Sequence, residues 1–518
     1  MESDRTSHRM IPLFSSGLVA VILFGFYLRT LAPGLTWAHY GVDGGDLIAA
    51  AVTLGVPHPT GYPTYTLLAH FFIDWLPLGE PAYEGALFSA VSASLAAAAF
   101  ALLLMKAMPQ DRPSRFLLGP LVGLAIGLSS LVWSQAVIVE VYGLHFLFLV
   151  LGLWLAWRLG DPERPVARAD YVLACLMGLG MGNHVTLVLM LPLWAALILI
   201  RRRRKGLSLS TGAGLGLAFL LGLAVYLYLP LRAGAYPPVN WGVPNTMRGF
   251  LWTVTAQAYK GLAFGLPVEA IPDRLSAWSK LLLGSYGVVG LLFGLTGLVM
   301  GRSNSRAVDR GAVWILVVYS VFAIGYNTAD SADYLIPAYL AFGWFVAHGI
   351  DFASQEVLGR LPPRAAWFSW LPLALFAGSL AWGVPAALKQ ADASQDRRAS
   401  EYGLQAMEQA PPGAVMLTWE ATDAFPLWYY QYALGMRQDV AILVVPLMQF
   451  DWYYDVVRTT YPGLHLGREL FTQEAVRSGA VLLALSDRPR CQAVSEGQED
   501  DLRLHIVCPS PGDPGSPE

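Results

Sequence analysis

The stretch Asp43–Tyr65, DGGDLIAAAVTLGVPHPTGYPTY, combines two carboxylates, a histidine and three prolines. It directly follows an apolar run over 12–33 that is long enough to cross a bilayer. Polar groups placed just after a membrane span lie near one membrane surface. The side on which they lie, and the groups that join them there, therefore decide what this stretch does.

Composition places the whole chain in a membrane. Of 518 residues, 55% are hydrophobic and only 14% are charged, with a mean hydropathy of +0.47. Soluble domains carry roughly 25% charged residues, so this chain reads as a polytopic membrane protein. The net charge of −3 gives no sign of a nucleic-acid partner. The first apolar run is too long for a signal-peptide core and predicts an uncleaved span.

Eleven apolar runs predict membrane spans: 12–33, 84–105, 116–133, 141–158, 170–183, 185–200, 211–230, 281–300, 311–328, 335–349 and 367–385. Basic residues flank these runs on alternate sides, as in the RRRRK sequence that starts at Arg201. Positive loops face the cytoplasm, which predicts a cytoplasmic N-terminus. Residues 62–78 then form a helix on the outer surface or a re-entrant segment, and 171–200 is either one long helix or two that meet at Asn183 and His184.

The chain after residue 385 has the composition of a soluble domain. Strand-like runs at 413–419, 439–446 and 480–486 alternate with helical patterns at 390–409 and 423–434. We therefore expect a transmembrane module over 1–385, with an external loop at 34–83, and a small extracytoplasmic α/β domain over 386–508. Residues 509–518 read as a disordered tail. Outside the cytoplasm Cys491 and Cys508 could form a disulfide, which the sequence leaves open.

The two acids of the opening stretch fall on the outer side of this topology. Their ordinary explanation is structural, with Asp46 capping a helix that starts near Leu47 and Asp43 solvated. A pair beside two glycines favours function instead, since Gly44 and Gly45 let the backbone approach a ligand. A carboxylate here could remove a proton from an acceptor hydroxyl or bind a cation.

Further outer residues are candidates for substrate binding. His58 and Tyr62 lie in a proline-rich turn that has a purely structural explanation, although His58 could bind a phosphate. Glu140, followed by Tyr142, is an acid at membrane depth, which is costly unless it is functional or paired. Asn183 and His184 are candidates as well, and the alternative is that they are buried and form hydrogen bonds to neighbouring helices.

Two more groups complete the set. Arg232 precedes Asn240 and Trp241, and its forked guanidinium suits a phosphate as well as snorkelling to the interface. The segment YNTADSADYLIPAY, Tyr326–Tyr339, carries groups that suit a sugar, or alternatively a solvated loop; they are Asn327, Asp330, Asp333 and Tyr334. No metal-ligand spacing, P-loop or GxSxG motif stands out.

Four ordered blocks resemble one known family. They are Asp43–Leu68, WSQAVIVEVYGLH (Trp133–His145), Tyr326–Tyr339 and Thr422–Met448. The family includes the vertebrate transmembrane protein O-mannosyltransferase, and it lies in the GT-C superfamily of membrane glycosyltransferases. Its first block usually has Ser, Glu, an aromatic residue and Pro where this chain has Gly44, Asp46, Leu47 and Thr60.

The resemblance implies a GT-C fold of about 11 transmembrane helices and a glycosyltransferase that uses a polyprenyl-phosphate sugar, with mannose favoured. It implies that Asp43 is the catalytic base, with Asp46 as its helper, in an inverting transfer to a hydroxyl group. The acceptor would be Ser or Thr of a translocated protein, or else a glycan or lipid. Arg232, His58 and His184 are candidates to bind the leaving phosphate, and the C-terminal domain would cover the site or recognise the acceptor.

We expect no cofactor beyond the lipid-linked donor, and the sequence leaves open whether a divalent metal is required. We also expect the chain to lie in a bacterial plasma membrane. Two other classes stay open. A transporter or flippase of lipid-linked sugars would use the outer acids for proton coupling, although transporters usually carry such groups at the midplane. A scaffold with a partner-binding outer domain would leave the acid-rich loop without a role.

Overall fold

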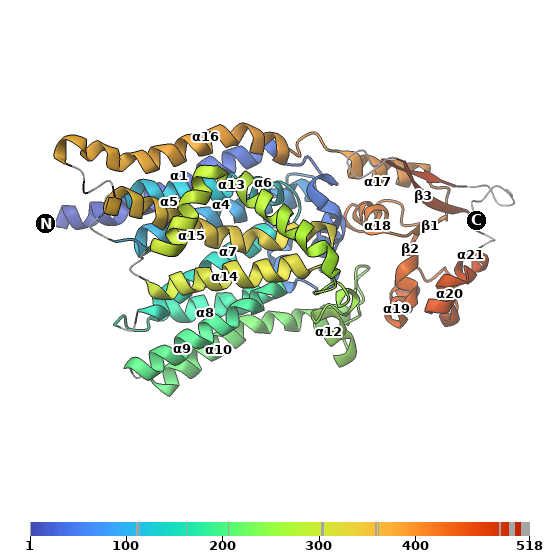
Figure 1. The fold of residues 1–518 in the computed structure, drawn as a ribbon. Coiled ribbons are helices and arrows are strands. Elements are labelled where there is room, and N and C mark those ends of the chain that lie inside the picture. Colours follow the sequence, from blue (N-terminus) through green and yellow to red (C-terminus); the bar gives the residue numbers. More distant parts are fainter. Residues whose placement is uncertain are drawn as a thin grey trace.

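The computed structural model describes residues 2–109, 112, 114–161, 163–205, 207–301, 305–357, 360, 362–485, 488–496 and 503–508. A long helical bundle carries the N-terminus at one end and a small sheet-containing unit at the other (Figure 1). The bundle helices are α1 Glu2–Thr30, α2 Gly44–Thr53, α3 Pro63–Trp75, α4 Pro81–Ala107, α5 Arg115–Gly127, α6 Ser130–Ala136, α7 Tyr142–Gly160, α8 Arg168–Met181, α9 Leu191–Lys205, α10 Leu209–Leu223, α11 Tyr228–Ala233, α12 Met247–Val254, α13 Ile271–Met300, α14 Arg306–Gly325, α15 Ile336–Phe352 and α16 Leu371–Ala391.

The described helices account for the predicted spans. Nine of them are long and apolar enough to cross a membrane, and the pair α5 and α6, bent by 67°, would make a tenth. The remaining predicted span, 170–183, forms α8, which has only 14 residues. Helix α8 is about 21 Å long, less than the roughly 30 Å hydrocarbon core. The chain is an integral membrane protein with this short helix inside the bundle.

Two ambiguous segments take definite forms. Residues 62–78 contain α3, a helix of 13 residues that packs against α2 and α4 and is too short to span. The region 171–200 is broken at residues 182–184, between α8 and the 3₁₀ turn Val185–Met190 that precedes α9. The alternative with two helices that meet at Asn183 and His184 is therefore the observed one.

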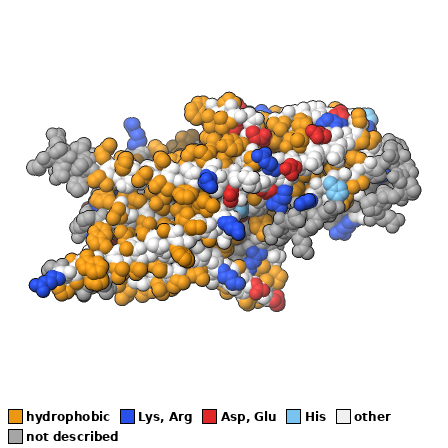
Figure 2. Space-filling model, turned by 90° about the horizontal axis from the view of Figure 1, so that it is seen from above, with side chains coloured by type: hydrophobic (Ala, Val, Ile, Leu, Met, Phe, Trp, Pro, Cys, Tyr) orange, Lys and Arg blue, Asp and Glu red, His pale blue; other side chains and the backbone are white. Residues whose placement is uncertain are grey.

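The centre of the bundle is built from α4 and α15. Every residue of α15 from Ile336 to Asp351 is buried. Helix α4 is rich in alanine and serine, whose small side chains let α1, α5 and α7 pack closely around it. Leucines of the peripheral α10 and α13 face outward. Figure 2 shows the resulting hydrophobic surface over the bundle, with acidic side chains gathered toward the opposite end from the N-terminus.

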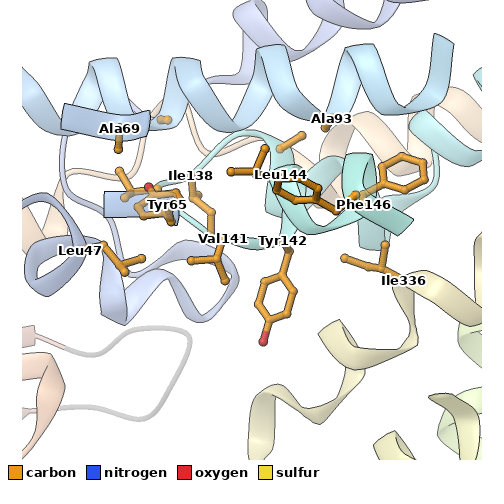
Figure 3. Close-up of a cluster of buried hydrophobic side chains, with 14 of the residues drawn as sticks. Leu47, Tyr65, Ala69, Ala93, Ile138, Val141, Tyr142, Leu144, Phe146 and Ile336 are labelled. Carbon is orange, nitrogen blue, oxygen red and sulfur yellow. The ribbon is translucent and has the colours of Figure 1, made fainter. Parts of the chain in front are cut away.

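A cluster of buried apolar side chains joins α3, α4 and α7. Figure 3 shows Tyr65, Ala69, Ile138 and Leu144 in this cluster. The ring of Tyr142, at the start of α7, points away from the cluster (Figure 3). The apolar packing thus fixes the backbone from which Tyr142 projects.

The C-terminal unit contains a four-stranded sheet of order β2-β1-β3-β4. Strand β1 (Val415–Thr418) pairs in parallel with β2 (Ala441–Val444) and β3 (Arg490–Glu496), and β4 (Arg503–Val507) pairs antiparallel with β3. Its helices are α17 Arg398–Gln409, α18 Ala421–Trp428, α19 Asp451–Thr460, α20 Gln473–Arg477 and α21 Ala480–Ala484.

The prediction of a strand at 480–486 is wrong, because Ala480–Ala484 forms the helix α21. The third and fourth strands are β3 and β4, which lie further along the chain. A disulfide joins Cys491 to Cys508. These two residues face each other in the β3–β4 register, since Gln492 pairs with Val507. The tail predicted at 509–518 lies outside the described residues.

The C-terminal unit docks directly on α2, the helix that follows Asp43. Gly45 lies against the backbone of Phe425 in α18, and a Cβ atom at Gly45 would be 2.2 Å from the Phe425 carbonyl oxygen. Thr36 donates a hydrogen bond to Asp396 at 2.8 Å, and Ser400 donates one to the carbonyl of Leu35 at 2.9 Å. The acid-bearing segment is therefore held between the bundle and the sheet unit.

We expect Gly45→Ala to lower the free energy of unfolding by about 1–3 kcal/mol, and with it the midpoint of thermal unfolding. The added methyl group would clash with the Phe425 backbone, which cannot move aside as a flexible side chain would. Gly383→Ala is the matched control, since nothing lies within 4 Å of a Cβ atom there. Tryptophan fluorescence during heating of the detergent-solubilised chain measures both. Equal midpoints for the two variants would contradict the close docking.

Candidate functional site

A cavity of about 420 Å³ lies at the end of the bundle where the C-terminal unit docks. Segments far apart in the sequence meet there, from the loop before α2 to the segment between α14 and α15. Eight of the candidate residues line it: Asp43, His58, Tyr62, Glu140, Tyr142, His184, Asp330 and Tyr334. The fold thus gathers four separate sequence motifs around one space.

His58 lies between the two acids of the opening stretch. Its Nδ1 is 2.7 Å from Asp46 Oδ2, and its Nε2 is 3.3 Å from Asp43 Oδ2. Its backbone N–H also donates to Asp46 Oδ2 at 2.9 Å. Asp46 is 0% exposed, whereas the Asp43 side chain is 39% exposed on the face that lines the cavity. Of the two acids, only Asp43 can reach a molecule in this cavity.

The charges of this group depend on each other. Burial lowers the pKa of His58, but the carboxylates of Asp43 and Asp46 outweigh it and raise the pKa to about 9. At neutral pH His58 is therefore an imidazolium that donates a hydrogen bond to Asp46 and forms an ion pair with Asp43. Burial raises the pKa of Asp43, and the charge of His58 partly offsets that rise.

Neither acid caps a helix, as the structural explanation would require. Asp43 occupies the N-cap position of α2 but its side chain makes no capping hydrogen bond. Asp46 lies in the first turn, where its oxygens accept from His58 and from the indole Nε1 of Trp241 at 3.1 Å. Trp241 thus donates to the carboxylate oxygen of Asp46 that His58 does not bond.

A second polar group lies across the cavity. His184 Nδ1 is 2.7 Å from Thr186 Oγ1, which is 3.2 Å from His145 Nε2. Burial lowers the pKa of His184 to about 4, and the charge of His58 adds to the effect. His184 is therefore neutral at physiological pH and offers a hydrogen bond rather than a charge.

Aromatic rings surround His184. The rings of Tyr142, Tyr334 and Tyr62 lie 5.5, 5.7 and 6.3 Å from it between centroids. Glu140 lies next to them, and burial, followed by the charge of Asp43, raises its pKa well above the usual range. Aromatic faces beside the polar groups of His184 and Glu140 form a surface suited to a polar ligand.

The other candidates lie outside the cavity. Arg232 donates to the carbonyls of Leu54 at 2.7 Å and Thr53 at 3.2 Å, at the end of α2. The remaining candidates that do not line the cavity are Asp46, Asn183, Asn240, Trp241, Asn327 and Asp333. Asn183 and Asn240 donate to the carbonyls of Val141 and Ala233, both at 3.2 Å. Arg232, Asn183 and Asn240 therefore hold backbone carbonyls in place and do not face the cavity.

Many lining residues were not among the candidates, and three of them carry polar groups of interest. Tyr259 and Lys260 come from the loop between α12 and α13, and Thr186 follows His184. Lys260 is the one lysine or arginine among the described lining residues. The loop sequence TAQAYKGLAFG, 255–265, contains no recognisable motif. No signal in the sequence alone could have placed Lys260 in the same cavity as Asp43.

The C-terminal unit closes one side of the site. Phe425 of α18 stacks on His58, with ring centroids 6.4 Å apart and an interplanar angle of 17°. Trp241 contacts Phe425 and Trp452, at 6.3 and 5.9 Å between centroids. The sheet unit therefore contacts the groups that hold Asp43, although it does not itself line the cavity among the described residues.

Two segments match sequence models of a known family. Residues 43–207 match the N-terminal domain of protein O-mannosyl-transferase TMEM260, and residues 399–466 match TMEM260-associated domain 2. The chain is 27% identical to protein O-mannosyl-transferase TMEM260 of Mus musculus, over 82% of this chain and 62% of that protein. It is 26% identical to the Dictyostelium discoideum protein of that name, over 60% of this chain and 40% of that one. The chain thus spans less than two thirds of either relative.

Solved structures share the fold at low sequence identity. ArnT from Cupriavidus metallidurans, bound to undecaprenyl phosphate, matches with a TM-score of 0.59 and 13% identity over 95% of this chain and 97% of that one. The oligosaccharyltransferase AglB from Archaeoglobus fulgidus, in complex with an inhibitory peptide and a dolichol-phosphate, matches with a TM-score of 0.51 and 12% identity, over 95% and 70%. Both are GT-C enzymes, and their likeness confirms the predicted fold class, whereas the matches in sequence confirm the family resemblance.

Proposed function

We propose that this chain, a GT-C protein similar to the protein O-mannosyl-transferases, transfers a sugar from a polyprenyl-phosphate carrier to a hydroxyl group. Mannose is the favoured sugar, and Ser or Thr of a translocated protein is the favoured acceptor. The observation that carries the proposal is the Asp43 carboxylate, which faces a 420 Å³ cavity and is held by His58. The reaction takes place at the outer membrane surface, with the N-terminus in the cytoplasm.

Asp43 acts as the general base. It removes the proton of the acceptor hydroxyl while the oxygen attacks the anomeric carbon. The bond between that carbon and the phosphate oxygen breaks, its electron pair leaves with the lipid phosphate, and the anomeric configuration inverts. His58 and the buried Asp46 are positioning residues, because they fix the Asp43 carboxylate and do not contact the reacting atoms.

Lys260 binds the leaving phosphate. Its ammonium group can offset the negative charge that grows on the phosphate as the bond breaks. The sequence suggested Arg232, His58 and His184 for this task, but Arg232 is bonded to two carbonyls and His58 to two carboxylates. Neutral His184 instead donates a hydrogen bond to the sugar, Glu140 contacts its polar groups, and Tyr142 and Tyr334 pack against its faces.

Reconstitution of the full chain tests the function. Vesicles containing polyprenyl-phosphate mannose and a Ser/Thr-containing peptide should yield a peptide one hexose heavier, detected by mass spectrometry. Parallel reactions with a glycan acceptor and a lipid acceptor identify the acceptor class. Movement of the donor across the bilayer with no product in any reaction would instead identify a flippase.

The pH dependence tests the role of Asp46. His58 has a raised pKa of about 9, so its positive charge and the stability it contributes are present at low pH and lost as pH rises through 9. We expect kcat/KM to fall on the alkaline side near pH 9. Asp46→Asn removes one carboxylate from His58, lowers its pKa and shifts that fall to lower pH.

Asp74→Asn is the control for this profile. Asp74 also pairs with a histidine, His70, at 3.5 Å, but lies 68% exposed and outside the cavity. Its removal should leave the profile unchanged. If kcat/KM of Asp46→Asn fell at the same alkaline pH as in the unsubstituted chain, His58 would not be the group that titrates.

A further inference from the structure

A second large cavity, of about 500 Å³, lies at the opposite end of the bundle. It is formed where α4, α7 and α9 end and where α14 begins, on the side of the N-terminus (Figure 1). Five basic residues and one acid line it: Lys106, Arg201, Arg204, Arg306, Arg310 and Asp161. An excess of positive charge in a concave site attracts an anion.

The four arginines divide into two sets by their contacts. Arg201 is buried, and it donates to the carbonyls of Arg158, Leu159 and Asp161 at 3.0–3.3 Å, and also to Arg164. It closes the end of α7 and is not available to a ligand. Arg204, Arg306 and Arg310 are exposed, and within the described part of the chain no carboxylate pairs with them.

The rest of the cavity wall is apolar apart from Ser305. Its apolar lining residues are Trp157, Leu159, Leu197, Ile200 and Ala307. Ile200 is 38% exposed on the outer surface of α9, so the cavity opens toward the lipid that surrounds the bundle. A ligand that fits must carry a negative group beside the arginines and an apolar part beside this wall. Phospholipids with a net negative charge have both.

We propose that this cavity binds the phosphate headgroup of an anionic phospholipid from the leaflet on the N-terminal side. Its phosphate lies among Arg204, Arg306 and Arg310, and its acyl chains leave past Ile200. Basic pockets between transmembrane helices on the cytoplasmic side bind such headgroups in other membrane proteins. This site is separate from the proposed transfer reaction, which takes place at the other end of the bundle.

Lipid binding to the full chain in detergent tests the proposal. Native mass spectrometry with phosphatidylglycerol and with zwitterionic phosphatidylcholine should show one retained phosphatidylglycerol molecule in clear preference. The double variant Arg306→Gln/Arg310→Gln should weaken this binding roughly 30-fold, at about a factor of five for each basic side chain near the headgroup. Unfolding midpoints measured in phosphatidylcholine establish that the variant is folded.

The control removes the same charge outside the cavity. Arg202 and Arg203 are exposed neighbours of Arg204 that do not line the site. Arg202→Gln/Arg203→Gln should retain phosphatidylglycerol as the unsubstituted chain does. Equal weakening by both double variants would overturn the proposal, because it would show attraction to a diffuse positive surface. If millimolar inorganic phosphate raised the unfolding midpoint of the chain and phosphatidylglycerol did not, the lipid assignment would be overturned.

Discussion

Asp43→Asn should lower kcat/KM for sugar transfer by roughly 10²- to 10⁴-fold, the range expected when a general base is removed. Asparagine keeps the shape of the side chain and can still accept a hydrogen bond from His58. It cannot take the proton of an acceptor hydroxyl at neutral pH. Initial rates of peptide glycosylation, measured with the purified variant in vesicles, give the size of the effect.

Two further measurements separate chemistry from folding in this variant. The affinity for the lipid-linked donor and the midpoint of thermal unfolding should change little, since Asp43 is only partly buried. Asp330→Asn, which removes another carboxylate that lines the cavity, should cost much less activity. Full activity of Asp43→Asn would rule out Asp43 as the base.

The second large effect is expected at Lys260. Lys260→Met removes the one basic side chain among the described lining residues and should lower kcat/KM about 10²-fold, comparable to the loss of one donor that stabilises developing charge. Lys260→Arg should restore part of the rate because it keeps the positive charge. Titration of the donor in single-turnover reactions shows whether the loss lies in binding or in the chemical step.

Arg248→Met provides the matched control for Lys260. Arg248 lies in the neighbouring helix α12 but does not line the cavity. Its variant should transfer sugar at an unchanged rate. If Lys260→Met were equally active, the phosphate would have to be bound by groups other than Lys260.

The spans could be predicted because a bilayer demands long apolar runs that few other structures need. Strands β1 and β2 were predicted at 413–419 and 439–446, but β3 and β4 were not. The run AVLLALS at 480–486 is apolar and brief, and such runs fit a buried strand and a helix equally well. Strand β4 alternates exposed and half-buried residues in only five positions, which left no clear signal.

The site shows a similar division. Asp43 and Glu140 stand out because a carboxylate is costly in a chain this apolar. Arg232 looked equally special, yet it serves the end of α2. Lys260 gave no signal, because only the folding of the loop before α13 brings it to the cavity. Residue type and depth were readable in the sequence, but the direction of each side chain was set by tertiary packing.

The short helix α8 has a consequence for competition between water and the acceptor. Helix α8 starts at Arg168 and ends after about 21 Å, before the far side of a roughly 30 Å hydrocarbon layer is reached. His184 lies just beyond its end, is buried, and lines the cavity. A sugar bound beside it is enclosed by buried side chains, so an acceptor hydroxyl that enters the cavity meets little competition from hydrolysis of the donor.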